Sequence, residues 1–222
     1  MQDQQIAIRA AEPTFFAKVM FYFGLALLMS AAGTYVGFNY VIQIFIANPA
    51  LIWVLFAAEL ILVFTSRIWI TKYPVNYLLF SAFTFITGVT LVPLLASVML
   101  EFGGPDIIIK ALAATTLMFT ATAVFGWVTK RDLSGLRGFL ITALIGMIVV
   151  SLIGIFIPWS NTFEMVFAGF GVVVFSGYTM YDFQKLKTMP QDRPIDAAMM
   201  LYLDIFNLFI YILRLMSGSR RN

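Results

Sequence analysis

Seven long apolar segments constrain the fold of this 222-residue chain more than any other feature of its sequence. A helix needs about 20 mostly apolar residues to cross a bilayer, and each segment reaches that length. The chain is 61% hydrophobic and only 11% charged, whereas soluble domains carry about 25% charged residues. The sequence therefore predicts an all-α membrane protein with seven transmembrane helices. The predicted spans are Val19–Tyr40, Leu51–Ile70, Val75–Leu100, Ile107–Thr129, Gly138–Pro158, Met165–Leu186 and Ala197–Met216.

Turn signals separate these segments and leave only short loops between them. Pro and Gly end helices, and they do so here at Asn48-Pro49, Tyr73-Pro74 and Gly103-Gly104-Pro105. Because such loops hold no second domain, we expect one transmembrane domain over residues 19–216. A cytoplasmic N-terminal segment, 1–18, precedes it, and a short tail, 217–222, follows. Small residues in the spans are expected to permit close helix packing; they are Gly24, Gly33, Gly37, Gly146 and Gly154.

The distribution of Lys and Arg predicts the orientation of the chain in the membrane. With seven spans, ten of these residues fall on the N-terminal side and four towards the other side. Because cytoplasmic loops carry the excess of basic residues, the N-terminus is expected in the cytoplasm and the C-terminus outside. Arg220 and Arg221 do not fit this arrangement, because they are basic residues at the end that it places outside. A re-entrant seventh segment, which would return the C-terminus to the cytoplasm, is the alternative.

The composition narrows the classes of function. The chain has neither Cys nor His, so zinc, haem and His-based catalysis lose their usual ligands and bases. The net charge of +3 orients the spans and does not indicate a nucleic-acid partner. We therefore expect a membrane protein that carries no resident cofactor.

Two aspartates, Asp182 and Asp204, lie in segments that should be inside the bilayer. A carboxylate at that depth costs at least about 3 kcal/mol unless it is paired, neutralised or hydrated. Helical rise puts both within roughly 5–12 Å of the cytoplasmic face, together with Arg67 of the second span. Glu59 lies on the same span, about 12 Å deeper than Arg67. We expect the two aspartates and a basic residue to form one cluster.

Helical spacing also predicts where the seventh span lies. Asp204, Asn207, Tyr211 and Arg214 share one face of that helix, because they follow the spacing i, i+3, i+7, i+10. A polar stripe in lipid must face the bundle interior or a water-filled cavity. The seventh helix is therefore expected to be central, with its polar side towards the sixth.

Simpler roles stay open for each of these groups. Asp182 could be an interfacial carboxylate, and Asp204 could make a purely structural hydrogen bond. Arg67 could extend its charge to the cytoplasmic headgroups, and Glu59 could be a neutral structural acid.

Neighbouring carboxyl groups suggest a proton-controlled contact between two helices. Two such groups do not both ionise cheaply, so their protons leave in two coupled steps. Oxygen ligands also suit Ca²⁺, and Asp182 and Asp204 could bind it weakly, with Glu59 and Asn207 completing a cation path. An intramembrane aspartyl protease also uses two aspartates in adjacent spans. Its second motif should read Gly-x-Gly-Asp, whereas this chain has Leu201-Tyr202-Leu203-Asp204. The mismatch disfavours the protease, and we expect a protein that is not an enzyme.

At these residues the sequence resembles the Bax inhibitor family, whose proteins carry the transmembrane Bax-inhibitor motif. The resemblance rests on the segments 177–187 (GYTMYDFQKLK), 201–209 (LYLDIFNLF), 129–134 (TKRDLS) and 85–91 (FITGVTL). It covers essentially the whole chain. It implies seven helices with the last surrounded by the other six, and a pH-sensitive calcium leak gated by the pair Asp182 and Asp204.

The resemblance also implies a basic partner for the aspartates at the end of the second helix. Here Ile70 occupies the expected position, so Arg67 and Lys72 are the candidates. The short termini are of a bacterial type, which predicts the bacterial inner membrane as the location. Some bacterial relatives instead regulate a membrane protease, and this is the alternative function. The expected partners are thus the lipid bilayer, Ca²⁺ and H⁺, or a membrane protease.

Overall fold

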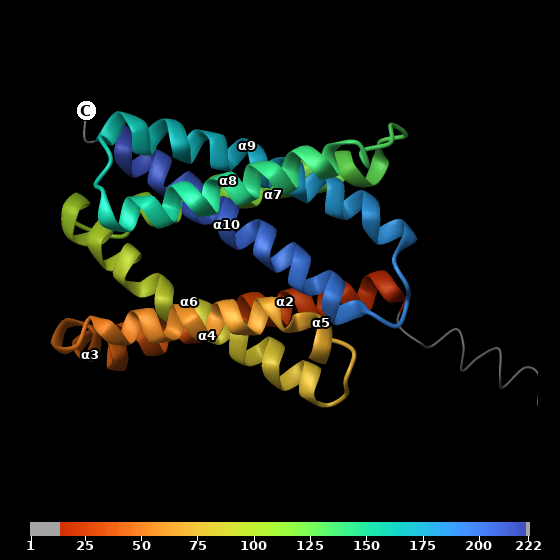
Figure 1. Ribbon diagram of the computed structural model, residues 1–222, viewed down its shortest axis with the longest axis horizontal. Helices are drawn as coiled ribbons and strands as arrows, with labels where there is room; N and C mark the ends of the chain where they lie inside the picture. The colour runs from red at the N-terminus through yellow and green to blue at the C-terminus, as the bar shows by residue number, and fades with distance from the viewer. Residues whose placement is uncertain (1–13, 221–222) are drawn as a thin grey trace, which may run out of the picture. The chain divides into compact units, whose positions relative to one another are not determined.

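The computed structural model describes residues 14–220, and every regular element among them is a helix (Figure 1). Residues 1–13 of the predicted N-terminal segment and residues 221–222 of the predicted tail lie outside the described residues. The elements are α2 (Phe15–Val36), η1 (Gly37–Val41, a π-helix), α3 (Ile42–Ala47), α4 (Ala50–Phe64), α5 (Ser66–Trp69), α6 (Val75–Phe102), α7 (Asp106–Val128), α8 (Leu136–Phe156), α9 (Asn161–Lys185), η2 (Leu186–Thr188, a 3-10 helix) and α10 (Pro194–Arg220).

Six helical runs in the described part of the chain are long and apolar enough to cross a membrane. They are Phe15–Ala47, Val75–Phe102, Asp106–Val128, Leu136–Phe156, Asn161–Thr188 and Pro194–Ser219. The first of them continues from α2 through η1 into α3. The prediction of a multi-span, all-helical membrane protein is thus confirmed, while the count of seven and the central position of the last helix stay predictions.

The second predicted span, Leu51–Ile70, is two helices rather than one. α4 has 15 residues and rises about 22 Å, less than the roughly 30 Å of a bilayer core. The helix is interrupted at Thr65, whose hydroxyl donates a hydrogen bond of 2.6 Å to the Ile61 carbonyl. Such a back-bond to the preceding turn bends helices. Trp69 Nε1 donates to the same hydroxyl at 3.3 Å and ties α5 to this bend.

The described part of the chain forms two compact units, the first comprising residues 14–90 with 189–199. In this unit α2 and α6 approach each other at two glycines. A Cβ on Gly33 would collide with the Phe85 carbonyl, and one on Gly88 would collide with the Ser30 backbone. Thr34 Oγ1 donates to the Gly88 carbonyl at 3.0 Å beside this crossing. The expected packing role is therefore confirmed for Gly33.

The second unit comprises the described residues 91–188 and 200–220. α9 packs against both α7 and α8, and Figure 1 shows these helices running alongside one another. A Cβ on Gly126 of α7 would overlap the Met180 backbone of α9, so the two helices touch there through their main chains. The packing role expected for Gly24 and Gly146 is wrong, because a Cβ at either position would meet nothing within 4 Å.

Candidate functional site

Asp182 and Asp204 come together where α9 packs against α10. These helices run antiparallel, since Gly171 faces Tyr211 at one level and Lys185 contacts Met200 at another. Both aspartates lie between these two levels, with exposed fractions of only 6% for Asp182 and 4% for Asp204.

Two further side chains share the electrostatic environment of these acids. Asp204 interacts with Asp182 and with Lys185. Tyr178, one turn before Asp182 on α9, interacts with both carboxyl groups. We refer to Tyr178, Asp182, Lys185 and Asp204 as the carboxylate cluster. It combines two acids, a phenol and an ammonium group at one helix contact.

One oxygen of this cluster stands out. Asp204 Oδ2 is buried and has no hydrogen-bond partner among the described residues. Because a buried polar atom without a partner is costly, this oxygen is suited to take up a proton or to contact a passing cation. No group of three or more acidic side chains that could hold a metal ion occurs within residues 14–220. Two carboxylates alone suit weak, transient Ca²⁺ contact better than tight storage, since Ca²⁺ takes six to eight oxygens in its high-affinity sites.

Lys185 supplies a positive charge within the cluster. It sits in the last turn of α9, and its Nζ contacts Met200 Sδ at 3.2 Å. The predicted partners Arg67 and Lys72 are exposed residues of the first unit, and their pairing with the aspartates stays a prediction. The i, i+3 spacing of Asp182 and Lys185 is the signal in the sequence that points to Lys185.

Glu59 and Asn207, the residues of the predicted cation path, belong to different units. Glu59 on α4 accepts a hydrogen bond of 2.6 Å from Thr90 Oγ1 of the first unit. Asn207 donates to the Leu203 carbonyl one turn earlier on α10, at 2.7 Å. Each side chain is thus hydrogen-bonded within its own unit, and the path that would join them stays a prediction.

Comparison with known proteins identifies the family. The family model described as "Inhibitor of apoptosis-promoting Bax1" matches residues 12–222. The chain belongs to the Bax inhibitor family. The resemblance predicted from the sequence motifs is thereby confirmed, and the description names an inhibitor and not an enzyme.

Relatives of the chain come from bacteria and from yeast. An uncharacterized protein of Campylobacter jejuni is 34% identical over 94% of this chain and 90% of its own length. The inner membrane protein YbhL of Escherichia coli K12 is 32% identical over 99% of this chain and 97% of its own length. Bax inhibitor 1 of Schizosaccharomyces pombe is 36% identical over 68% of this chain and 55% of its own length.

A glutamine next to the cluster joins two of the motifs that mark this Bax inhibitor family member. Gln184 Nε2 donates to the Arg131 carbonyl at 2.7 Å. Its Oε1 accepts from the Leu133 backbone N–H at 2.8 Å. One amide therefore fastens the α7–α8 loop to the end of α9. Sequence reasoning missed this role, because an amide side chain carries no charge or spacing signal.

The same loop contains a carboxylate that serves as an internal control. Asp132 is exposed and accepts hydrogen bonds of 2.9 Å from both the backbone N–H and the Oγ of Ser134, which lower the pKa of Asp132. With a lowered folded pKa, its contribution to loop stability is present above the ordinary value of about 3.9 and is lost as the pH falls through the folded pKa. We predict that Asp132→Asn leaves any pH response near neutrality unchanged, measured as calcium flux into liposomes.

Proposed function

We propose that this protein is a pH-responsive calcium leak channel of the bacterial inner membrane, gated by Asp182 and Asp204, and that it is not an enzyme. The observation that carries the proposal is the buried carboxylate pair, with the unpartnered Asp204 Oδ2 between α9 and α10. In this proposal the N-terminus is cytoplasmic, the C-terminus is periplasmic, and the transported ion is Ca²⁺.

Gating follows from the charge that the pair carries. Two ionised carboxylates repel each other, and both attract Lys185, so each proton added or removed changes the force across the α9–α10 contact. Closely packed helices adopt a few discrete arrangements and do not deform continuously, so a change in charge at one contact can favour one arrangement over another. The ionised pair also offers the hard oxygen ligands that Ca²⁺ requires.

The test is calcium flux into liposomes that contain the purified full-length protein, measured across pH. Wild-type protein is expected to pass Ca²⁺ at a rate that depends on pH. Absence of flux at every pH would overturn the channel. If a membrane protease copurifies with a protein that passes no calcium, regulation of that protease becomes the favoured function.

Lys185 gives a prediction that separates it from other basic residues. Removing a positive charge beside an acid makes ionisation of that acid harder, so Lys185→Met is expected to move the flux profile to higher pH. Lys187→Met is the matched control, because the Lys187 Nζ lies 5.5 Å from the ring centre of Trp127 and has no part in the cluster. Equal shifts in the two variants would show that Lys185 acts only through surface charge.

A further inference from the structure

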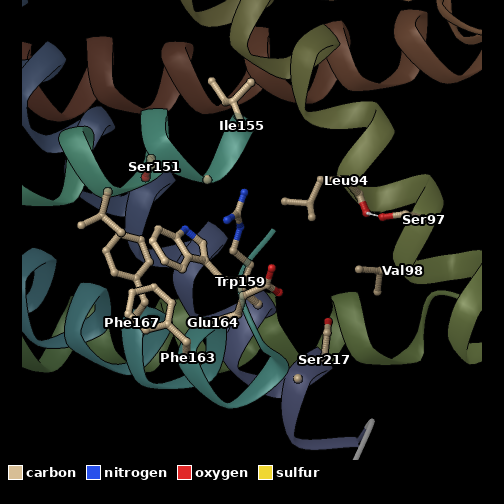
Figure 2. Close-up of a pocket in the computed structure, with 14 residues that line it drawn as sticks. Leu94, Ser97, Val98, Ser151, Ile155, Trp159, Phe163, Glu164, Phe167 and Ser217 are labelled. Atoms are coloured by element: carbon tan, nitrogen blue, oxygen red, sulfur yellow. Dashed lines mark hydrogen bonds between the residues drawn. The ribbon is translucent and has the colours of Figure 1, made fainter. Parts of the chain in front are cut away.

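A pocket of about 410 Å³ lies in the second unit, at the end of α9 and α10 remote from the carboxylate cluster. Its walls come from the C-terminal part of α6, from α8, from the loop that precedes α9, and from α9 and α10. In Figure 2, Trp159, Phe163 and Phe167 gather on one side, and Leu94, Ser97 and Val98 lie on the other. Pockets of about 300–1,000 Å³ are of the size that holds small ligands.

The pocket carries one charge of each sign. Glu164, in the first turn of α9, and Arg214 of α10 both line it, and both are exposed and accessible to a ligand. Trp159 Nε1 is buried and has no hydrogen-bond partner among the described residues, so it has an N–H to offer. Ser217 Oγ donates to the Leu213 carbonyl at 2.8 Å, which leaves its oxygen free to accept. Such a lining suits a ligand that carries both a negative and a positive group.

The aromatic wall adds a second attraction for the cationic group of such a ligand. The rings of Trp159 and Phe163 lie 4.6 Å apart, and those of Phe163 and Phe167 lie 6.1 Å apart. Ring faces attract ammonium groups electrostatically. The ammonium of a zwitterion placed beside Glu164 would therefore meet a carboxylate and an aromatic surface together.

The pocket lies at the end of two membrane spans, where the headgroup of a lipid could reach it. α8 ends at Phe156 and α9 begins at Asn161, so Trp159 lies between two spans, at the level of the lipid headgroups. Ile155 is 48% exposed and Phe163 is 38% exposed, which gives the pocket an apolar rim. A headgroup in the pocket could thus keep its acyl chains against apolar protein surface.

We propose that this pocket binds a phosphoethanolamine group, carried by an aminophospholipid. Arg214 and the Trp159 N–H bind the phosphate, and Glu164 with the aromatic wall binds the ammonium. This assignment does not depend on calcium transport, because it concerns the other end of α9 and α10.

Native mass spectrometry of the detergent-purified full chain tests the proposal. The probes are phosphatidylethanolamine, phosphatidylglycerol with the same acyl chains, and free phosphoethanolamine. The wild type is expected to bind phosphatidylethanolamine about tenfold more tightly than phosphatidylglycerol, because the latter lacks the ammonium that bonds to Glu164. Glu164→Gln is expected to abolish that preference, and Arg214→Gln to weaken the binding of both lipids by about tenfold.

Two further variants make the result decisive. Lys110→Gln removes a positive charge from α7 outside the pocket and is expected to bind as the wild type does. Trp159→Phe keeps the aromatic ring, removes the N–H and is expected to weaken phosphate binding, which preserves the test if Arg214→Gln fails to fold. Equal wild-type affinity for the two lipids, or equal losses in Lys110→Gln and Arg214→Gln, would overturn the site. Displacement of the lipid by free phosphoethanolamine would support the site and identify a soluble source for the ligand.

Discussion

Asp204→Asn is expected to flatten the dependence of calcium flux on pH, the largest functional effect that we predict for a single substitution. Asparagine keeps the size of the side chain and cannot ionise, so Asp182 loses the like-charged neighbour with which its protonation is coupled. The flux of the wild type is expected to change several-fold across the titration of the pair, and that of the variant to vary by less than about twofold. The measurement is the initial rate of calcium entry into liposomes at a series of pH values.

Variants of two other carboxylates, Asp182 and Asp132, complete this experiment. Asp182→Asn is expected to behave like Asp204→Asn, and the double variant to add little, because residues that act as a unit are not additive. Asp132→Asn removes an exposed carboxylate near the same end of α9 and is expected to keep the wild-type profile. A wild-type profile in both single variants of the pair would contradict the gate, even if the leak itself persisted.

Gly126→Ala is expected to cause a large loss of stability. The added methyl would overlap the carbonyl and Cα of Met180. Backbone atoms cannot swing aside as a side chain does, so α7 and α9 must separate. Overpacking lowers the free energy of unfolding by about 1–3 kcal/mol. Because the obstacle here is backbone, we expect a loss at the upper end of that range, which corresponds to a fall in apparent Tm of roughly 10 °C. Thermal unfolding in detergent, followed by circular dichroism, gives the measurement.

Gly146→Ala is the control for this effect. Gly146 lies within α8, where a Cβ would meet nothing within 4 Å. Alanine is favoured over glycine in a helix by about 1 kcal/mol, so this variant is expected to be as stable as the wild type or slightly more stable. A similar fall in Tm for both variants would mean that helix composition, rather than the α7–α9 contact, sets the loss.

The succession of long apolar helices could largely be predicted from the sequence because hydropathy and helix-ending residues act locally. The α8 helix illustrates this, since the predicted span Gly138–Pro158 and the observed Leu136–Phe156 differ by two residues at each end. The division of Leu51–Ile70 could not be predicted in this way. Its apolar run is continuous, and the interruption depends on how the Thr65 hydroxyl is bonded.

The candidate site was predictable in part, for a similar reason. An acidic residue in an apolar span is rare because placing it in lipid costs free energy, so Asp182 and Asp204 are recognisable in the sequence alone. Helical spacing places Lys185 on the same face as Asp182. Its position against Met200 and Asp204 depends on side-chain direction across a helix contact, and this the sequence does not show. The glycines show the same limit, because the composition of α7 and α8 does not distinguish the crowded Gly126 from the open Gly146.

The double hydrogen bond of Gln184 has a mechanical consequence. Because its amide holds both Arg131 and Leu133 of the α7–α8 loop, we expect a displacement of the last turn of α9 to be transmitted to this exposed loop. The chain has no cysteine, so a single Lys130→Cys substitution would carry one spectroscopic probe on this exposed loop. The rearrangement that we propose beside Asp182 would thereby become observable at this exposed position.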